Sequence, residues 1–193
     1  MSNDIYRAPD VELAVDNSEV DELYAVSTRK FWIMHLLTFS LYDVYWFYRH
    51  WEQQNLRHNL GLWPAVRAVL FIFFVYSLFS RIQAAAKAKG LANVPNLSLL
   101  ALVWYLLFFA QIGITIFYRD VFLTTVWPSP VMGVIGNVLS GFIFASVQRV
   151  ANQVLDDEEG RKNSRITVAN IAWIVAALLY NGLSLGGAIV RAS

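Results

Sequence analysis

The stretch LLTFSLYDVYWFYRHWEQQN, residues 36–55, begins like a membrane segment and ends in polar residues, with an acid, Asp43, among its aromatic side chains. An ionised group at the centre of a bilayer costs about 2.5–3.5 kcal/mol even on the most lenient insertion scale, so its depth matters. Asp43 precedes Arg49 by six residues, which is about 9 Å along a helix. We therefore expect Asp43 at the border of the hydrocarbon core, in a girdle of Tyr and Trp side chains.

Composition places the whole chain in a lipid environment. The 193 residues are 57% hydrophobic and 15% charged, and the mean hydropathy is +0.46. Soluble domains have about 45–50% apolar and about 25% charged residues. The absence of cysteine excludes disulfides, thiol nucleophiles and Cys-ligated metal sites. A formal net charge of +1 gives no argument for nucleic-acid binding.

Five apolar runs are long enough, or nearly long enough, to cross a bilayer core, which needs roughly 20 residues of helix. They predict an all-α, polytopic membrane helix bundle with about five transmembrane helices. The first and fourth runs are near the lower length limit and contain polar residues, so either could be tilted, kinked or re-entrant. The runs cover residues 31–48, 62–80, 97–118, 131–147 and 166–190.

Basic residues choose the orientation of such a bundle, because Lys and Arg gather in cytoplasmic connections. With five spans, the N-terminal tail and the second and fourth connections share one side and carry most of the basic residues. We therefore expect a cytoplasmic N-terminus, an external C-terminus and a location in the cell inner (plasma) membrane. A re-entrant first run is disfavoured, since it would move the basic second and fourth connections outside. The first connection, with Arg49 and Arg57, is then expected at the outer headgroups.

The segments outside the runs also have recognisable features. Residues 1–30 contain seven acids and predict a flexible acidic cytoplasmic tail, with a short helix around Val20 to Ala25, before the helical membrane domain at 31–193. The second helix is expected to continue through SRIQAAAKAKG and to stop at Gly90.

The fourth helix is expected to continue beyond its apolar run, through VQRVANQVLD at residues 147–156. The apolar residues of this segment recur at helical spacing, so it needs a partner face. The acids at 156–159 should end the helix as a solvated loop. The tail and the helix extensions could therefore contact a protein partner or a second copy of the chain.

One charge pair is predicted inside the membrane region. Arg67 lies five residues beyond Leu62, so it reaches a depth similar to that of Asp43 if the first two helices are antiparallel. Opposite charges at one depth can pair, which costs less than leaving either charge alone. We therefore predict an Asp43–Arg67 contact between the first two helices. The alternative is that each side chain reaches the headgroups separately.

Amide side chains mark the later runs, at Gln111, Asn137, Asn170 and Asn181. In membranes such groups commonly form hydrogen bonds between helices, each worth about 0.6 kcal/mol. Small residues at four-residue steps beside Asn137 and Asn181 favour close helix packing. A solute pathway lined by Gln111, Asn137 and Asn181 is the alternative interpretation.

The sequence gives no catalytic, cofactor-binding or metal site. His35, His50 and His58 lack the spacing of a metal-binding motif, and no glycine-rich nucleotide loop or nucleophile elbow is present. We therefore expect no enzyme and no cofactor. The expected function is that of a membrane component acting in interaction, assembly or regulation. The alternative is a small oligomeric transporter or channel using the intramembrane amides.

The segment STRKFWIMHLLTFSLYDVYWFYRHWEQQN, residues 27–55, resembles the bacterial membrane family described as domain of unknown function 4234. The likeness lies in a pattern of the form Thr-x-Gly-Leu-Tyr-x-x-Tyr-Trp, which Thr38, Leu41 and Tyr42 begin and Tyr45 and Trp46 complete, with serine in place of glycine at position 40. VQRVANQ is similar to a Gln-x-x-x-Asn stretch of such proteins. The resemblance implies a bacterial inner-membrane protein without an assigned activity.

Overall fold

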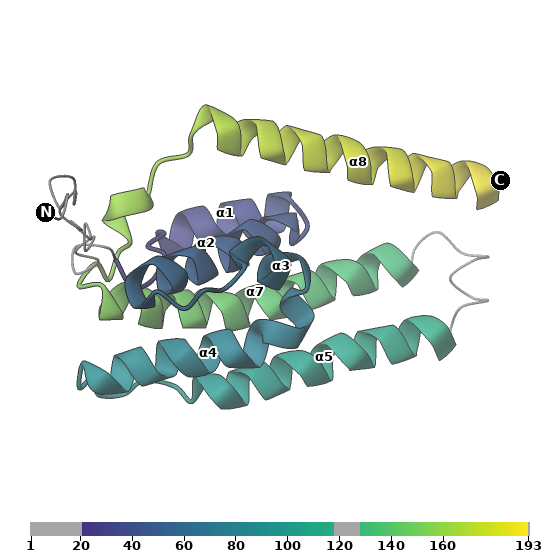
Figure 1. The fold of residues 1–193 in the computed structure, drawn as a ribbon. Helices are drawn as coiled ribbons and strands as arrows, with labels where there is room; N and C mark the ends of the chain where they lie inside the picture. The colour runs from purple at the N-terminus through teal and green to yellow at the C-terminus, as the bar shows by residue number, and fades with distance from the viewer. Residues whose placement is uncertain (1–20, 118–127, 193) are drawn as a thin grey trace, which may run out of the picture.

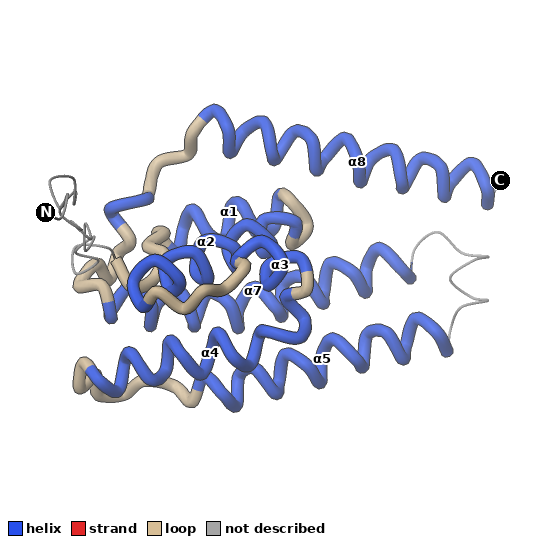
Figure 2. The backbone as a smooth tube through the Cα atoms, in the orientation of Figure 1, coloured by secondary structure: helices blue, strands red, loops and turns tan. Residues whose placement is uncertain are grey.

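The described part of the chain is entirely α-helical, as the sequence predicts. The structure is a computed structural model that describes the backbone of residues 21–117 and 128–192. Within these ranges it contains seven α-helices, one short 3₁₀ helix and no strand (Figure 2). The elements are α1 Thr28–Leu37, α2 Leu41–His58, α3 Pro64–Val69, α4 Phe71–Ala88, α5 Leu97–Phe117, α7 Pro128–Val154, η2 Arg161–Asn163 and α8 Val168–Ala192.

Helices α4, α5 and α7 form one group, and the shorter helices α1, α2 and α3 form a second group beside it. Helices α4, α5 and α7 pack against one another, and α1 also packs on α7. Helices α2 and α3 lie over this layer, while α8 runs along the far side and contacts α1 (Figure 1). Helices α5, α7 and α8 extend well beyond the end of the α1–α3 group.

The first apolar run is not one straight helix, because the chain turns back within it. Helix α1 ends at Leu37, α2 begins at Leu41, and both Phe39 and Ser40 have left-handed backbone angles (φ +50° and +64°). The Thr38 hydroxyl donates to the carbonyl oxygen of Met34 (2.6 Å) and accepts from the Tyr42 amide (3.0 Å). One hydroxyl thus ends α1 and starts α2, and the run forms a helical hairpin.

The second predicted span is also divided, at Leu70, where the short α3 meets α4. Pro64 occupies the first turn of α3, as expected from its missing N–H. Helix α4 continues to Ala88 and is followed by Gly90 at φ +73°, which confirms the predicted helix extension and its stop. Each of the two N-terminal runs therefore forms two helices, separated by a bend.

Among the described residues, two helices are long and apolar enough to cross a membrane: α5 and the part of α7 from Val131 to Val154. Only 11% of the most apolar stretch of α5 and 33% of that of α7 is buried, whereas a core helix of a soluble protein would be mostly buried. Helix α8 is apolar and exposed from Val168 to Leu183 as well, but this stretch is shorter. A bundle of five spans is therefore not confirmed.

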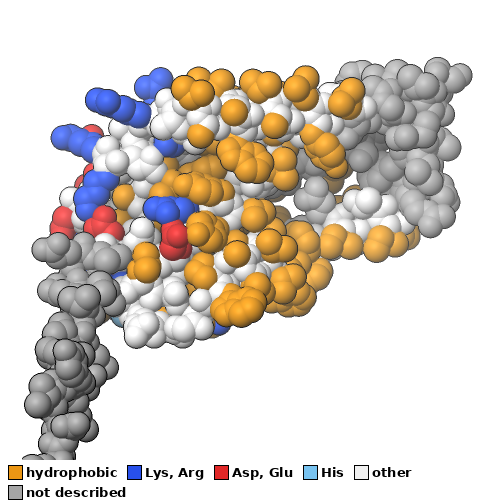
Figure 3. Space-filling model, turned by 45° about the horizontal axis from the view of Figure 1, so that its top comes forward, with side chains coloured by type: hydrophobic (Ala, Val, Ile, Leu, Met, Phe, Trp, Pro, Cys, Tyr) orange, Lys and Arg blue, Asp and Glu red, His pale blue; other side chains and the backbone are white. Residues whose placement is uncertain are grey.

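In the view of Figure 3, charged side chains of the described residues gather toward one end, and hydrophobic side chains cover much of the described surface beyond it. His58 Nε2 contacts Glu22 Oε1 (3.1 Å), and Lys89 Nζ pairs with Asp156 (2.6 Å). These contacts bring the C-terminal ends of α2, α4 and α7 to the same end. The first connection, expected on the opposite side from the second and fourth, therefore lies beside them.

Residues 21–27 form a non-helical strap rather than part of a flexible tail or a helix. Leu23 and Val26 are fully buried, and Tyr24 and Ala25 are nearly so. Because residues 1–30 contain seven acids, the composition of the tail does not reveal the apolar segment at 23–26. Burial of this segment removes apolar surface from water and so stabilises the fold. The predicted flexible tail fails for residues 21–30, and its first twenty residues lie outside the described part of the chain.

Gly160 presses against this strap. It adopts φ +64°, and a Cβ atom placed on it would lie 2.4–2.5 Å from backbone atoms of Val26 and Ser27. Backbone atoms cannot move aside as a flexible side chain does. The loop between α7 and α8 therefore needs glycine here for its close approach as well as for its backbone angle.

We predict that Gly160→Ala destabilises the protein more than Gly90→Ala. Both glycines have left-handed angles, so both changes carry a conformational cost of about 1–2 kcal/mol. Only the Gly160 change adds the collision with the strap, since nothing lies within 4 Å of the Cβ position at Gly90. Thermal unfolding in detergent, with limited proteolysis of the strap, measures the difference. Equal loss of stability in the two variants would contradict the packing of the strap against Gly160.

Candidate functional site

The hairpin between α1 and α2 encloses a buried histidine–aspartate pair. His35 Nδ1 lies 2.7 Å from Asp43 Oδ1, and His35 Nε2 lies 2.8 Å from the backbone carbonyl oxygen of Asn137 on α7. The His35 side chain is fully buried and that of Asp43 nearly so. The turn at Ser40 brings these two residues, eight positions apart, into direct contact.

The geometry limits where protons can lie in this pair. A carbonyl oxygen only accepts, so His35 must carry a proton on Nε2 to donate to Asn137. The other contact is then either an imidazolium donating to a carboxylate or a carboxylic acid donating to a neutral imidazole. Both arrangements have no net charge, so the pair avoids leaving an uncompensated ion in the apolar interior.

Asn137 connects the hairpin to α7 by its side chain as well. Its Nδ2 donates to Ser40 Oγ (3.1 Å), while its Oδ1 is buried without a hydrogen-bond partner among the described residues. Gly141 lies one turn further along α7, where a Cβ would fall 2.5 Å from the Trp32 ring and 2.9 Å from that of His35. The small-residue stripe predicted around Asn137 thus makes room for the aromatic side chains of α1.

The predicted Asp43–Arg67 contact is wrong. Asp43 pairs with His35, while the Arg67 guanidinium lies over the rings of Trp51 and Phe74, 4.5 Å and 4.6 Å from their centroids. A guanidinium over aromatic faces gains cation–π attraction. Arg67 therefore joins α3 to α2 and α4 through aromatic contacts, and the Arg81 guanidinium also lies near the Trp51 ring, 5.8 Å from its centroid.

The amides proposed to line a solute pathway have separate local roles. The Gln111 side chain fills the space beside Gly136, reaching within 2.2 Å of the position of a Cβ there. Asn181 Nδ2 donates to the Ala177 carbonyl oxygen of its own helix (2.8 Å). Asn170 Oδ1 accepts from Thr167 at the start of α8 (3.0 Å). Gln111 lies at the contact between α5 and α7, and Asn137 lies at the contact between α7 and the α1–α2 hairpin. Asn181 forms no hydrogen bond to Gln111 or to Asn137.

A second buried polar cluster fixes the strap, and its centre is Gln148 on α7. Gln148 Oε1 accepts from Trp46 Nε1 (2.6 Å) and from His50 Nε2 (3.2 Å). Its Nε2 donates to the Tyr24 carbonyl oxygen (3.0 Å) and to Asn152 Oδ1 (2.7 Å). Both polar atoms of the buried amide therefore have partners.

Asn152 and His50 complete this cluster. Asn152 Nδ2 donates to the Val26 carbonyl oxygen (3.0 Å), so the amides of α7 bind the strap at two points. Burial lowers the pKa of His50 to about 3, which keeps the imidazole neutral, with its proton on the Nε2 that faces Gln148. The predicted partner face of the 147–156 segment is real, since Val147, Val150 and Ala151 are buried.

Sequence reasoning missed His35 and gave Gln148 and Asn152 no role. The Gln-x-x-x-Asn spacing was visible and places both amides on one helix face. For the hairpin, the signal was the position of Ser40, where the resembled pattern has glycine and the structure has a left-handed angle. The contact of His35 with Asp43 forms because the turn at Ser40 brings the two side chains together.

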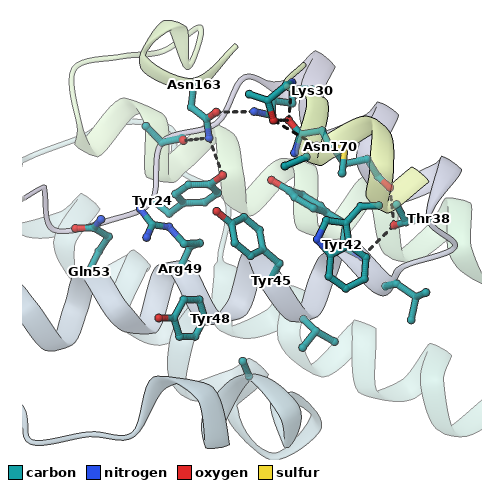
Figure 4. A pocket seen from close by; sticks show the side chains of 18 of the residues that line it. Tyr24, Lys30, Thr38, Tyr42, Tyr45, Tyr48, Arg49, Gln53, Asn163 and Asn170 are labelled. Carbon is teal, nitrogen blue, oxygen red and sulfur yellow. Dashed lines mark hydrogen bonds between the residues drawn. The ribbon is translucent and has the colours of Figure 1, made fainter. Parts of the chain in front are cut away.

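An open cavity of about 740 Å³ lies between the strap, helices α1–α3 and the start of α8. Figure 4 shows Tyr24, Tyr42 and Tyr45 at its centre, with Arg49 beside them. Its walls are polar toward the charged end of the molecule, where Arg49 and Gln53 of α2 line it, and apolar at the start of α2, along α3 and at Trp173 of α8. No group of three or more His, Asp or Glu side chains able to hold a metal occurs among the described residues.

Comparisons with known proteins add no relative. No family model matches the chain, and no curated protein and no solved structure shows significant similarity to it.

We predict that His35 and Asp43 are energetically coupled. His35→Leu or Asp43→Leu should each destabilise the protein by about 3 kcal/mol, because each leaves a buried polar partner without its hydrogen bond. The double variant should lose clearly less than the sum of the two. Chemical or thermal unfolding in detergent measures all four proteins of this cycle.

Arg67→Gln provides the control for this cycle. Its effect should add to that of Asp43→Leu, since Arg67 contacts aromatic rings instead of the acid. Coupling of Asp43 to Arg67, with additivity between Asp43 and His35, would contradict the geometry of the hairpin.

Proposed function

We propose that this protein is an integral inner-membrane protein that acts as an interaction, assembly or regulatory component. The observation that carries the proposal is the distribution of its surface. Long apolar helices are exposed along most of the molecule, and charged side chains gather at one end. Monomeric soluble proteins rarely expose apolar patches of more than a few hundred Å², so a bilayer is the solvent that suits this surface.

The threading we propose has three spans and two bent runs. Helices α5, α7 and α8 cross the bilayer, and α1–α4 lie in the half that is nearer the charged end. Helix α1 has ten residues, about 15 Å, or half of a hydrocarbon core of roughly 30 Å. The buried partners at the α1–α2 turn support this placement, because non-helical backbone at membrane depth is tolerated where protein covers it.

This threading strengthens the orientation argument from basic residues. An odd number of spans still puts the two termini on opposite sides. Arg49 and Arg57 now join the basic second and fourth connections, while Arg119 and Arg191 remain for the other side. We therefore propose that the charged end faces the cytoplasm. The objection to a re-entrant first run disappears once the second run also fails to cross.

The proposed interaction surface is this charged end. Here the strap is held by Gln148 and Asn152, and the acidic residues before Asp21 continue from it. A strap bound at several points gives an acidic segment a fixed origin on the cytoplasmic face. A binding segment attached in this way loses less freedom on contact with a partner than one on a long flexible tether.

Single cysteines test the threading, because the chain has none of its own. We expect His58→Cys and Ser164→Cys to be labelled by an impermeant maleimide only after the cytoplasmic side of the membrane is opened. A cysteine at Thr124, in the connection between α5 and α7, should be labelled in intact spheroplasts. The residue at position 58 discriminates between the two threadings, since five spans put it outside.

Two outcomes would contradict the proposed threading. One is labelling of His58→Cys from the same side as Thr124→Cys. The other is release of the chain from membranes by alkaline carbonate, which leaves spanning helices in the bilayer.

Deletion of the tail tests the interaction role. Removing residues 2–20 should leave the fold intact while abolishing co-purification of the partner. Removing residues 2–26 should also lower the unfolding temperature, because it takes away the buried Leu23, Tyr24 and Val26. Quantitative cross-linking and affinity purification compare the two deletions with the full chain. A partner that is retained at full yield by the 2–20 deletion would overturn the role of the acidic tail.

A further inference from the structure

The cavity beside the strap is lined in part by polar side-chain atoms that make no hydrogen bond within the described residues. Two buried side-chain polar atoms that line this cavity, Arg49 Nε and Gln53 Oε1, make no hydrogen bond within the described residues. The Tyr42 hydroxyl, in the same cavity, has the hydroxyl of Tyr24 as its neighbour. Buried polar groups in native proteins are almost always hydrogen-bonded. These polar groups around one open cavity are therefore available to a ligand that enters it.

Hydrogen-bond donors predominate at the centre of the cavity. Tyr24 Oη accepts a bond from Asn163 Nδ2 (2.6 Å) and lies beside the hydroxyl of Tyr42. The ring of Tyr45 lies 6.1 Å from that of Tyr24 and 5.8 Å from that of Tyr42, and Figure 4 shows the three hydroxyls turned toward one another. Burial raises the pKa of Tyr24, which keeps the hydroxyl protonated. A cluster of donors is complementary to an anion.

The charge of the polar wall has the same preference. Arg49, Lys30 and Lys162 line it, against one acid, Asp21, which pairs with Lys162 (2.9 Å). The Arg49 guanidinium lies 5.4 Å from the centroid of the Tyr24 ring and also bonds Glu52. The N-terminus of α8 contributes Thr167 and Asn170 to the wall, and the positive end of a helix dipole favours an anion there.

The other half of the cavity is apolar and open. Leu41 and Val44 of α2, Ala68 and Val69 of α3, and Trp173 of α8 line it. Val69 is 70% exposed and Trp173 is 57% exposed, so a ligand can enter between α3 and α8. The polar half lies toward the charged end of the molecule, which is the direction in which an inner-leaflet lipid would present its headgroup.

We propose that this cavity binds one anionic phospholipid from the cytoplasmic leaflet. Its phosphodiester lies against the hydroxyls of Tyr24, Tyr42 and Tyr45 and the guanidinium of Arg49. One acyl chain follows the apolar wall between α2, α3 and α8. The site gives the interaction component a lipid ligand, and it rests on the proposed location in a bilayer.

Native mass spectrometry of the full-length protein in detergent tests this site, with phosphatidylglycerol as the probe. Diacylglycerol with the same chains and inorganic phosphate serve as the two partial ligands. We expect phosphatidylglycerol to bind at least tenfold more tightly than diacylglycerol, and inorganic phosphate not to displace it at equal concentration. Binding of inorganic phosphate with the affinity of the lipid, or equal binding of diacylglycerol, would overturn the proposal.

Variants assign the binding to the cavity. Tyr42→Phe removes a hydroxyl whose neighbour in the protein is the hydroxyl of Tyr24 and keeps the buried ring, so the fold should tolerate it, and phosphatidylglycerol affinity should fall roughly tenfold. Arg49→Gln should lower it by a similar factor. Val69→Trp fills the apolar half from an exposed position and should weaken binding without disturbing the core.

Tyr76→Phe and Arg149→Gln, outside the cavity lining, are the matched controls and should bind like the unchanged protein. Wild-type affinity in Tyr42→Phe, Arg49→Gln and Val69→Trp together would overturn the site. Cysteine labelling at position 58 is measured separately, so a failed lipid site is distinguishable from a failed threading.

Discussion

A backbone that reverses inside an apolar bundle must bring a partner for every polar group that it takes out of water. This constraint explains the arrangement around the α1–α2 hairpin. Thr38 covers the ends of both helices, and the His35–Asp43 pair is neutral as a whole and is anchored to α7. The same requirement governs the strap, whose carbonyl oxygens receive the amides of Gln148 and Asn152. Helix α7 is thus the common support of both irregular segments.

The sequence predicts the long elements well because their signals are local. The ranges of α5 and α7, the extension of α4 to Gly90 and the end of α7 before the acids all follow from composition, periodicity and capping. The hairpin could not be predicted in this way. Phe39 and Ser40 are not residues that favour left-handed angles, so neither signals a turn. The mean hydropathy over residues 31–48 is therefore that of a single apolar run.

The polar contacts failed for a related reason. Depth along two straight antiparallel spans predicts Arg67 as the partner of Asp43, whereas the turn at Ser40 brings His35 to it. The strap was concealed by its acidic surroundings, since net charge describes a segment as a whole and burial depends on a few apolar residues within it. Gln148 and Asn152 could be placed on one helix face from their spacing, but their partners come from residues more than 100 positions away.

Helices α1–α4 end nearer the charged end than helices α5, α7 and α8 do, and this difference has a mechanical consequence in the proposed membrane setting. Of the described helices, α1–α4 widen the molecule near its charged end, while α5, α7 and α8 continue to the other end. Such a wedge displaces more lipid from one leaflet than from the other, so its insertion energy depends on the lateral pressure of each leaflet and on the curvature of the bilayer. In this proposed setting we expect the protein to gather where the membrane bends toward its narrow end.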